Sequence, residues 1–124
     1  MSSSEDEVLR FIEASFPSVW ALEVLLTLKR EPRVWTSSEL VIALRASDLV
    51  LVKAVDALVA AGLASTDEQG VTYRAANEDV ARCVEQVEQI YRARPDTVRR
   101  AIVSARSSRA SAFADAFKLW GGRS

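Results

Sequence analysis

Two helix-start signals that lie close together limit the fold of this chain more than any other feature. Thr36 can cap the first turn of a helix, and Glu39 follows three residues later, so that each side chain can satisfy a backbone amide in a capping box. Ser47 offers a second cap, and Gly62 is free to end the second helix in a left-handed conformation. The sequence therefore predicts two consecutive helices joined by a short turn, the second of them running to about Ala61.

The remaining predicted elements are mostly helical. Only four Gly and three Pro interrupt long stretches of helix-forming residues. Helices are predicted over residues 5–16 (capped by Ser4), 18–30, 77–91, 95–105 and 107–120, and two short strands over 63–65 and 71–75, with Gly70 in the turn between them. Residues 18–30 are apolar nearly all round, so this helix is expected at the centre of a core or under a partner.

The segment "SELVIALRASDLVLVKAVDALVAAGLA" resembles the helix-turn-helix of winged-helix transcriptional regulators of the MarR, ArsR and PadR-like superfamily. Its apolar positions are Leu40, Leu44, Leu51, Val55, Leu58 and Leu63, with the turn at Ser47 and the stop at Gly62. The resemblance implies a mainly α fold with a small β-hairpin wing (α+β), as one winged-helix domain over residues 1–124. Its core would span about 18–76, and the helices of residues 77–120 would serve dimerisation. The alternative is a pair of amphipathic helices in another small bundle.

The resemblance also implies which residues would face DNA. In that superfamily the second helix of the pair enters the major groove and the wing touches the DNA backbone. The matching positions here are Asp48, Leu49, Val50, Val52 and Lys53, and Arg74 on the returning strand could reach a phosphate. Base edges are read by cationic, amide and hydroxyl side chains, so an acid and three aliphatics make a poor reading surface. The acidic hairpin tip, "TDEQG", would also repel phosphates.

Three interpretations of this helix are open. In the first it reads double-stranded DNA weakly; in the second its aliphatic residues contact a protein of the transcription machinery or a second copy of the chain. The structural interpretation places Leu49, Val50 and Val52 in the core. However, Leu51 and Val55 already occupy the inward stripe, so at most part of that set can share it.

Positive charge is concentrated at the end of the chain. Residues 1–91 hold fifteen acids and eight bases, a balance of −7, whereas residues 92–124 hold two acids and eight bases, a balance of +6. Arg92, Arg94, Arg99 and Arg100 could therefore bind phosphates or an acidic partner; alternatively, they form a solvated face paired with the acidic helix "NEDVARCVEQVEQ". Phe113, Phe117 and Trp120 recur at helical spacing and are expected to pack in a homodimer.

The residue inventory argues against an enzyme. The chain has no histidine, the commonest general base and metal ligand, and no glycine-rich phosphate loop, so no catalytic residue, metal or cofactor is expected. Cys83 lies on an apolar stripe and is expected to be a buried structural thiol. With one cysteine, no signal peptide and a most apolar stretch, "VWALEVLLTL", of only ten residues that still contains Glu23, the sequence predicts a cytoplasmic protein that does not span a membrane.

Overall fold

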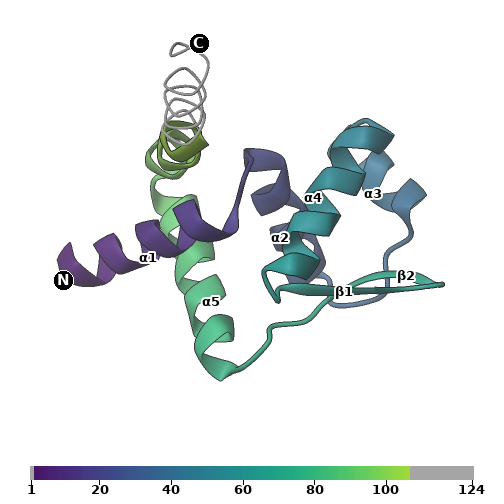
Figure 1. Cartoon of the computed structure of the whole chain (residues 1–124), viewed down its shortest axis with the longest axis horizontal. Coiled ribbons are helices and arrows are strands. Elements are labelled where there is room, and N and C mark those ends of the chain that lie inside the picture. The colour runs from purple at the N-terminus through teal and green to yellow at the C-terminus, as the bar shows by residue number, and fades with distance from the viewer. Residues whose placement is uncertain (1, 107–124) are drawn as a thin grey trace, which may run out of the picture.

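The computed structural model describes residues 2–106 (Figure 1). Their elements are, in chain order, α1 (Ser2–Ser15), α2 (Val19–Arg30), α3 (Ser37–Leu44), α4 (Asp48–Ala60), β1 (Ala64–Asp67), β2 (Gly70–Tyr73), α5 (Glu78–Ala93) and a last helix over residues 95–106. This mainly helical fold with one small antiparallel hairpin confirms the expected α+β class. The helix expected over residues 107–120, which carries Phe113, Phe117 and Trp120, lies outside the described residues.

Side-chain caps start the helices at the predicted places. Thr36 and Glu39 form the full capping box at α3, since Glu39 N donates to Thr36 Oγ1 over 3.2 Å and Thr36 N donates to Glu39 Oε1 over 2.9 Å. Ser47 caps α4 and Asn77 caps α5 in the same way. Only the predicted cap of the first helix is wrong, because α1 already begins at Ser2.

Local backbone geometry ends α3 and α4 where the sequence predicts. Arg45 adopts a left-handed conformation (φ +54°) that turns the chain sharply between the two helices. At the end of α4, Gly62 (φ +76°) donates its amide to Val59 O, and Leu63 donates to Leu58 O over 2.9 Å. These two bonds form a Schellman motif and satisfy carbonyls that the end of a helix would leave unpaired.

The hairpin is closed by a tighter turn than the sequence predicts. The carboxylate of Asp67 accepts from the amides of Gln69 and Gly70, at 2.8 and 3.2 Å, and the strands pair Asp67 with Gly70. The strands therefore extend to this two-residue loop, whereas the predicted strands stop short of it. Trp35 pairs with β2 from its other side as an isolated antiparallel bridge, because Trp35 and Val71 exchange both backbone hydrogen bonds at 2.8 Å.

The core has α2 at its centre. Six residues of α2 are buried, and the helix packs against α3, α4 and β2. Most of the apolar surface of this helix is thus covered within the chain, although Trp20 keeps 39 % of its surface exposed. On the other side of the molecule α1 packs across α5 (Figure 1), and Val8, Ile12 and Phe16 join Val84, Val87 and Ile102 in the same continuous core. Of the residues 77–120 expected to serve dimerisation, α5 and the 95–106 helix therefore bury their main apolar residues within the chain.

Polar contacts connect α5 to the helices before it. Lys29 Nζ lies 2.9 Å from Glu88 Oε1, Arg94 Nη1 lies 2.6 Å from Glu5 Oε1, and the hydroxyl of Tyr91 donates to Glu23 Oε1. Within residues 2–106 no single helix is long and apolar enough to cross a membrane; α1 and α2 pass that test only as a pair bent by 106°.

Candidate interaction surface on α4

The structure places most of the predicted contact residues of α4 on its outer side. Leu49 keeps 64 % of its surface exposed and Val52 keeps 54 %, whereas Leu51 and Val55 are buried on the opposite side. Asp48 and Lys53 are also exposed, and Val50 is half-buried. Leu49 and Val52 are therefore not core residues, and the structural interpretation of these two aliphatics is excluded.

Three exposed aliphatic residues and one acid form a stripe along the helix, which we call the α4 stripe: Leu49, Val52, Asp56 and Val59. Their spacing of three, four and three residues keeps them on one face of a helix. Val59 is 40 % exposed, and Asp56 is the single charged member. Asp56 and Val59 were not predicted as contact residues, although both follow Val52 at helical spacing. Ile42 on α3, which is 77 % exposed, was not predicted either.

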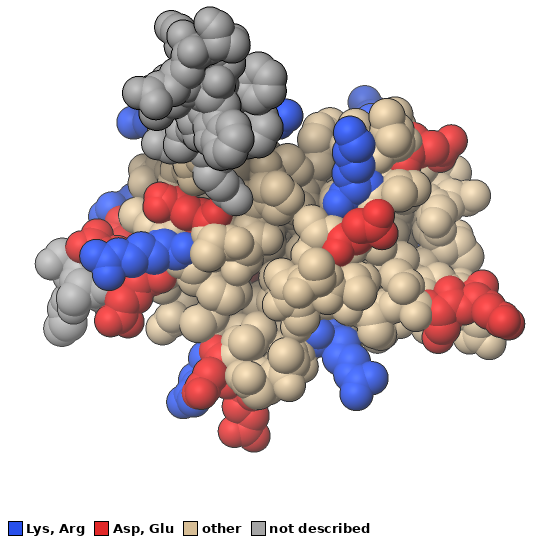
Figure 2. Space-filling model, in the orientation of Figure 1, with Lys and Arg blue, Asp and Glu red and all other residues tan. Residues whose placement is uncertain are grey.

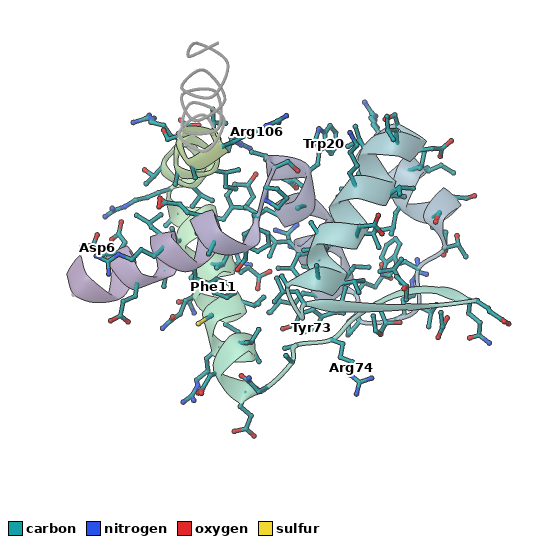
Figure 3. The ribbon with its side chains drawn as sticks, viewed as in Figure 1. Asp6, Phe11, Trp20, Tyr73, Arg74 and Arg106 are labelled. Atoms are coloured by element: carbon teal, nitrogen blue, oxygen red, sulfur yellow. The ribbon has the colours of Figure 1, made fainter. Side chains whose placement is uncertain are left out.

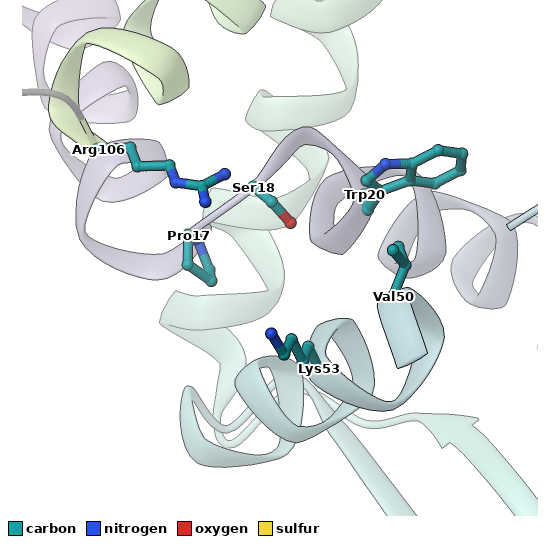
Figure 4. Close-up of a pocket in the computed structure, with 6 residues that line it drawn as sticks. All are labelled: Pro17, Ser18, Trp20, Val50, Lys53 and Arg106. Carbon is teal, nitrogen blue, oxygen red and sulfur yellow. The ribbon is translucent and has the colours of Figure 1, made fainter. Parts of the chain in front are cut away.

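A hollow of about 440 Å³ lies on one flank of α4, between the start of α2 and the end of the 95–106 helix (Figure 4). It is lined by Pro17, Ser18, Trp20, Val50, Lys53 and Arg106. Figure 4 shows the side chains of Lys53 and Arg106 directed into the same opening from different elements. Lys53 and Val50 were predicted as contact residues of α4, whereas Arg106 was not, because no local pattern indicates that the 95–106 helix returns to α4.

The hairpin does not add positive charge to the outer side of α4. Its tip carries Asp67 and Glu68, both exposed, and Figure 2 shows acidic side chains gathered there. Arg74 lies just after β2, and Figure 3 shows it directed away from α4, on the other side of the hairpin. The structure thus does not bring Arg74 together with Lys53 on a single surface.

Three of the four predicted C-terminal arginines pair with acids. Arg92 lies 3.8 Å from Glu88, Arg94 lies 2.6 Å from Glu5, and Arg99 lies 3.5 Å from Asp96. Arg99 also sits over the ring of Tyr91, 5.4 Å from its centroid. Arg100 is exposed. These contacts fit a solvated, ion-paired face, but only Arg92 pairs with the acidic helix as predicted, because Arg94 reaches Glu5 on α1 and Arg99 pairs with Asp96.

The junction of α2, β2 and α5 contains groups with shifted pKa values. The hydrogen bond from Lys29 lowers the pKa of Glu88, whose side chain is only 13 % exposed. Burial raises the pKa of Tyr91, and the carboxylate of Glu23 raises it further. Burial likewise raises the pKa of Tyr73. These groups lie in contacts between elements, and they are structural rather than part of the α4 stripe.

Metal-ligating side chains are scattered in the part of the chain that the structure describes. Residues 2–106 contain no cluster of three His, Cys, Asp or Glu residues that could hold a metal ion. Cys83 is half-buried, so the expectation of a fully buried thiol is wrong; it lies at the edge of the apolar side of α5 rather than at its centre. Comparison of the whole chain with protein-family models, with curated proteins and with solved structures finds no match.

Proposed function

We propose that this protein is a winged-helix module of the transcriptional-regulator type that acts through protein contact at the α4 stripe. Support for the scaffold comes from the order of its elements. A capped helix pair with a sharp turn (α3 and α4) precedes a hairpin that pairs with Trp35, which is the arrangement that the sequence resemblance implies. The helix that would read DNA in such a scaffold is α4.

The exposure of Leu49 and Val52 is the observation that carries the proposal. Burying an exposed aliphatic side chain against a partner is favourable by about 25 cal/mol per Å² of apolar surface removed from water. Exposed aliphatics grouped along one helix are typical of surfaces that bind another protein. The same positions offer no donor that could pair with a base edge, and Asp48 would repel the DNA phosphates. Protein contact therefore fits the chemistry of α4 better than base reading does.

Weak DNA binding is the second candidate function, and a specific observation favours it. Lys53 and Arg106 converge on the hollow beside α4, and both are exposed. From this hollow, Lys53 and Arg106 could contact a DNA phosphate without reading any base. Such binding would be independent of sequence and would weaken steeply with added salt.

Titration with random duplex DNA tests the second candidate directly. Fluorescence anisotropy at about 50 mM salt would detect the contribution of a few phosphate contacts, since affinity at low salt is dominated by counterion release. We expect no more than weak binding, and we expect the double variant Lys53→Ala/Arg106→Ala to abolish what there is. Submicromolar binding by the native chain at this salt would make DNA contact the main function.

Site-specific photo-crosslinking tests protein contact at the α4 stripe. A photoreactive amino acid is placed at position 49 in one variant and at position 103 in another, because Val103 is also an exposed aliphatic (56 %) but lies on the 95–106 helix. The proposal expects a discrete cross-linked protein band from position 49, lost on adding Val52→Asp, and none from position 103. Identical patterns from the two positions would contradict it.

A further inference from the structure

We infer that the α4 stripe binds the α4 stripe of a second copy of this chain, with the two helices antiparallel across a two-fold axis at the level of Ala54. This inference rests on the proposed function, since it names the partner for the same surface. From the sequence, a second copy is one of several possible partners of this helix, and the homodimer contact is expected at Phe113, Phe117 and Trp120. The inference places the dimer contact on α4 instead and gives its orientation and its residues.

The spacing of the α4 stripe makes it complementary to the α4 stripe of a second copy that runs antiparallel to it. Leu49 and Val59 lie five residues on either side of Ala54, and Val52 and Asp56 lie two residues on either side of it. A two-fold axis at Ala54 therefore places Leu49 opposite the Val59 of the second copy and Val52 opposite its Asp56. The same contacts occur twice, as an isologous interface requires. Spacings of three and four residues are also those by which two helices pack side by side.

Asp56 is the residue that selects this partner over a general aliphatic one. Its carboxylate lies among aliphatic residues of the stripe, and a partner that covered it without a cation would leave a buried unpaired charge. Lys53 lies beside Val52, so antiparallel pairing brings the Lys53 ammonium of each copy to the level of the other copy's Asp56. The structure gives neither Lys53 nor Asp56 an ion pair among the described residues. The second copy thus supplies the cation that the stripe lacks.

Parallel pairing would not give this complementarity. It would bring Lys53 level with Lys53 and Asp56 level with Asp56, so that like charges face each other along the interface. Antiparallel pairing also opposes the dipoles of the two α4 helices, which is favourable. The interface is small, so we expect a dimer that dissociates on dilution, with a Kd on the order of 10 µM.

Charge exchange between Lys53 and Asp56 tests the inference. In Lys53→Asp, four carboxylates would meet at the axis, and in Asp56→Lys, four ammonium groups would. Sedimentation velocity over a concentration series should show each single variant weakening the dimer at least about tenfold, and the double variant Lys53→Asp/Asp56→Lys restoring it. Val103→Asp is the matched control and should leave the dimer unchanged, because Val103 is as exposed as Val52 but lies on another helix. A wild-type chain that stays monomeric to millimolar concentration would overturn the inference, as would a dimer indifferent to all three α4 variants.

Disulfide trapping tests the orientation, independently of any dimer made by other parts of the chain. In a Cys83→Ser background, Leu49→Cys chains are mixed with Val59→Cys chains and oxidised. Antiparallel pairing predicts mixed 49–59 disulfides, since position 49 would lie about 15 Å from position 49 of the other copy by the rise of an α-helix. Predominant 49–49 and 59–59 products would overturn it. If the chain is monomeric but position 49 still cross-links to a different protein, the second-copy partner is wrong while the proposed function stands. If position 49 cross-links to no protein at all, both fail.

Discussion

Glu88 shows how a single side chain joins two parts of the molecule. Its carboxylate lies on α5 and contacts Lys29 at 2.9 Å and Arg30 at 3.5 Å, both on α2. The hydrogen bond from Lys29 is the main reason why its pKa falls below the ordinary value of 4.5. A carboxyl whose folded pKa is lowered stabilises the fold fully above its unfolded pKa, and this stabilisation is lost as the pH falls through the folded pKa.

We therefore predict a pH-dependent cost for Glu88→Gln. At pH 7 the variant should lower the free energy of unfolding by about 1–2 kcal/mol, because the cations of α2 lose a charged and largely buried acceptor. The difference from the native chain should shrink as the pH falls through the lowered pKa of Glu88, because the native side chain then becomes protonated as well. Urea unfolding at pH 7 and over a series of decreasing pH values measures this. Glu85→Gln on the exposed side of α5 is the control. A difference that stays constant with pH would contradict the assignment.

The hydroxyl of Tyr91 gives a second residue-scale prediction. Tyr91 is buried, and its hydroxyl donates to Glu23 Oε1 on α2. Tyr91→Phe removes the donor and leaves the carboxylate in a half-buried place, so it should lower the free energy of unfolding by about 1 kcal/mol. Tyr73→Phe is the matched control, because Tyr73 is half-buried in the same junction. Thermal unfolding that shows equal losses for the two variants would argue against a role for the Glu23 bond.

These tertiary partners could not be predicted from the sequence, whereas the helix caps could. Thr36 and Glu39 are three residues apart, so their geometry follows from the helix itself. Glu88 and Lys29 are 59 positions apart, and the same pair of residue types occurs in many places along the chain. Only the packing of α2 against α5 selects one of them.

The hairpin is the element whose backbone is most constrained. Gly70 has φ +148°, and a Cβ added there would lie 2.2 Å from the carbonyl oxygen of Trp35. Gly70→Ala must therefore strain the turn and break the bridge between Trp35 and Val71, and we expect it to destabilise the fold by about 3 kcal/mol or more. Gly62→Ala also meets a left-handed backbone (φ +76°), but its nearest neighbour is the Ala76 Cβ at 3.1 Å, so about 1–2 kcal/mol is expected. Chemical denaturation of both variants compares them. An equal or smaller loss at Gly70 would show that the hairpin does not pack on Trp35 as described.

The existence of the hairpin was predictable from the sequence, but its register was not. Gly70 and the polar turn marked its place, while the extension of β1 to Asp67 depends on which amides the carboxylate of Asp67 accepts. The bridge from Trp35 to Val71 depends on how the loop before α3 lies over β2, and no local pattern indicates it.

At the scale of the whole molecule, α2 and α4 show why an apolar helix has to be interpreted in its packing. The sequence allowed α2 to be either central to a core or covered by a partner, and the structure places it at the centre because α3, α4 and β2 surround it. In α4 the inward stripe was predicted correctly from its spacing. Its outward side is also aliphatic, and exposed Leu49 and Val52 have no core left to enter. Spacing predicted the position of α4, and only the packing revealed which of its aliphatics remain for a partner.

The outward side of α4 supports a final prediction about DNA. If the side chains of this surface limit DNA binding, rather than its access to a duplex, then adding cations there should create DNA binding. Leu49→Arg/Val52→Arg should bind random duplex DNA at least about tenfold more tightly than the native chain at 50 mM salt, and each new phosphate contact should steepen the salt dependence by about one unit. Both positions are more than half exposed, so the stability of the fold should change by no more than about 0.5 kcal/mol.

Fluorescence anisotropy across a salt series measures the gain, with Val103→Arg as a control that adds positive charge away from α4. A gain specific to positions 49 and 52 would mean that α4 can approach a duplex and that its side-chain chemistry, rather than its geometry, limits DNA binding in the native chain. An equal gain in DNA affinity from Val103→Arg would mean that the added net charge, and not its place on α4, explains the increase. No gain in either variant would mean that α3 or the acidic hairpin tip keeps the duplex from α4, because the added guanidinium groups would then have no phosphate within reach.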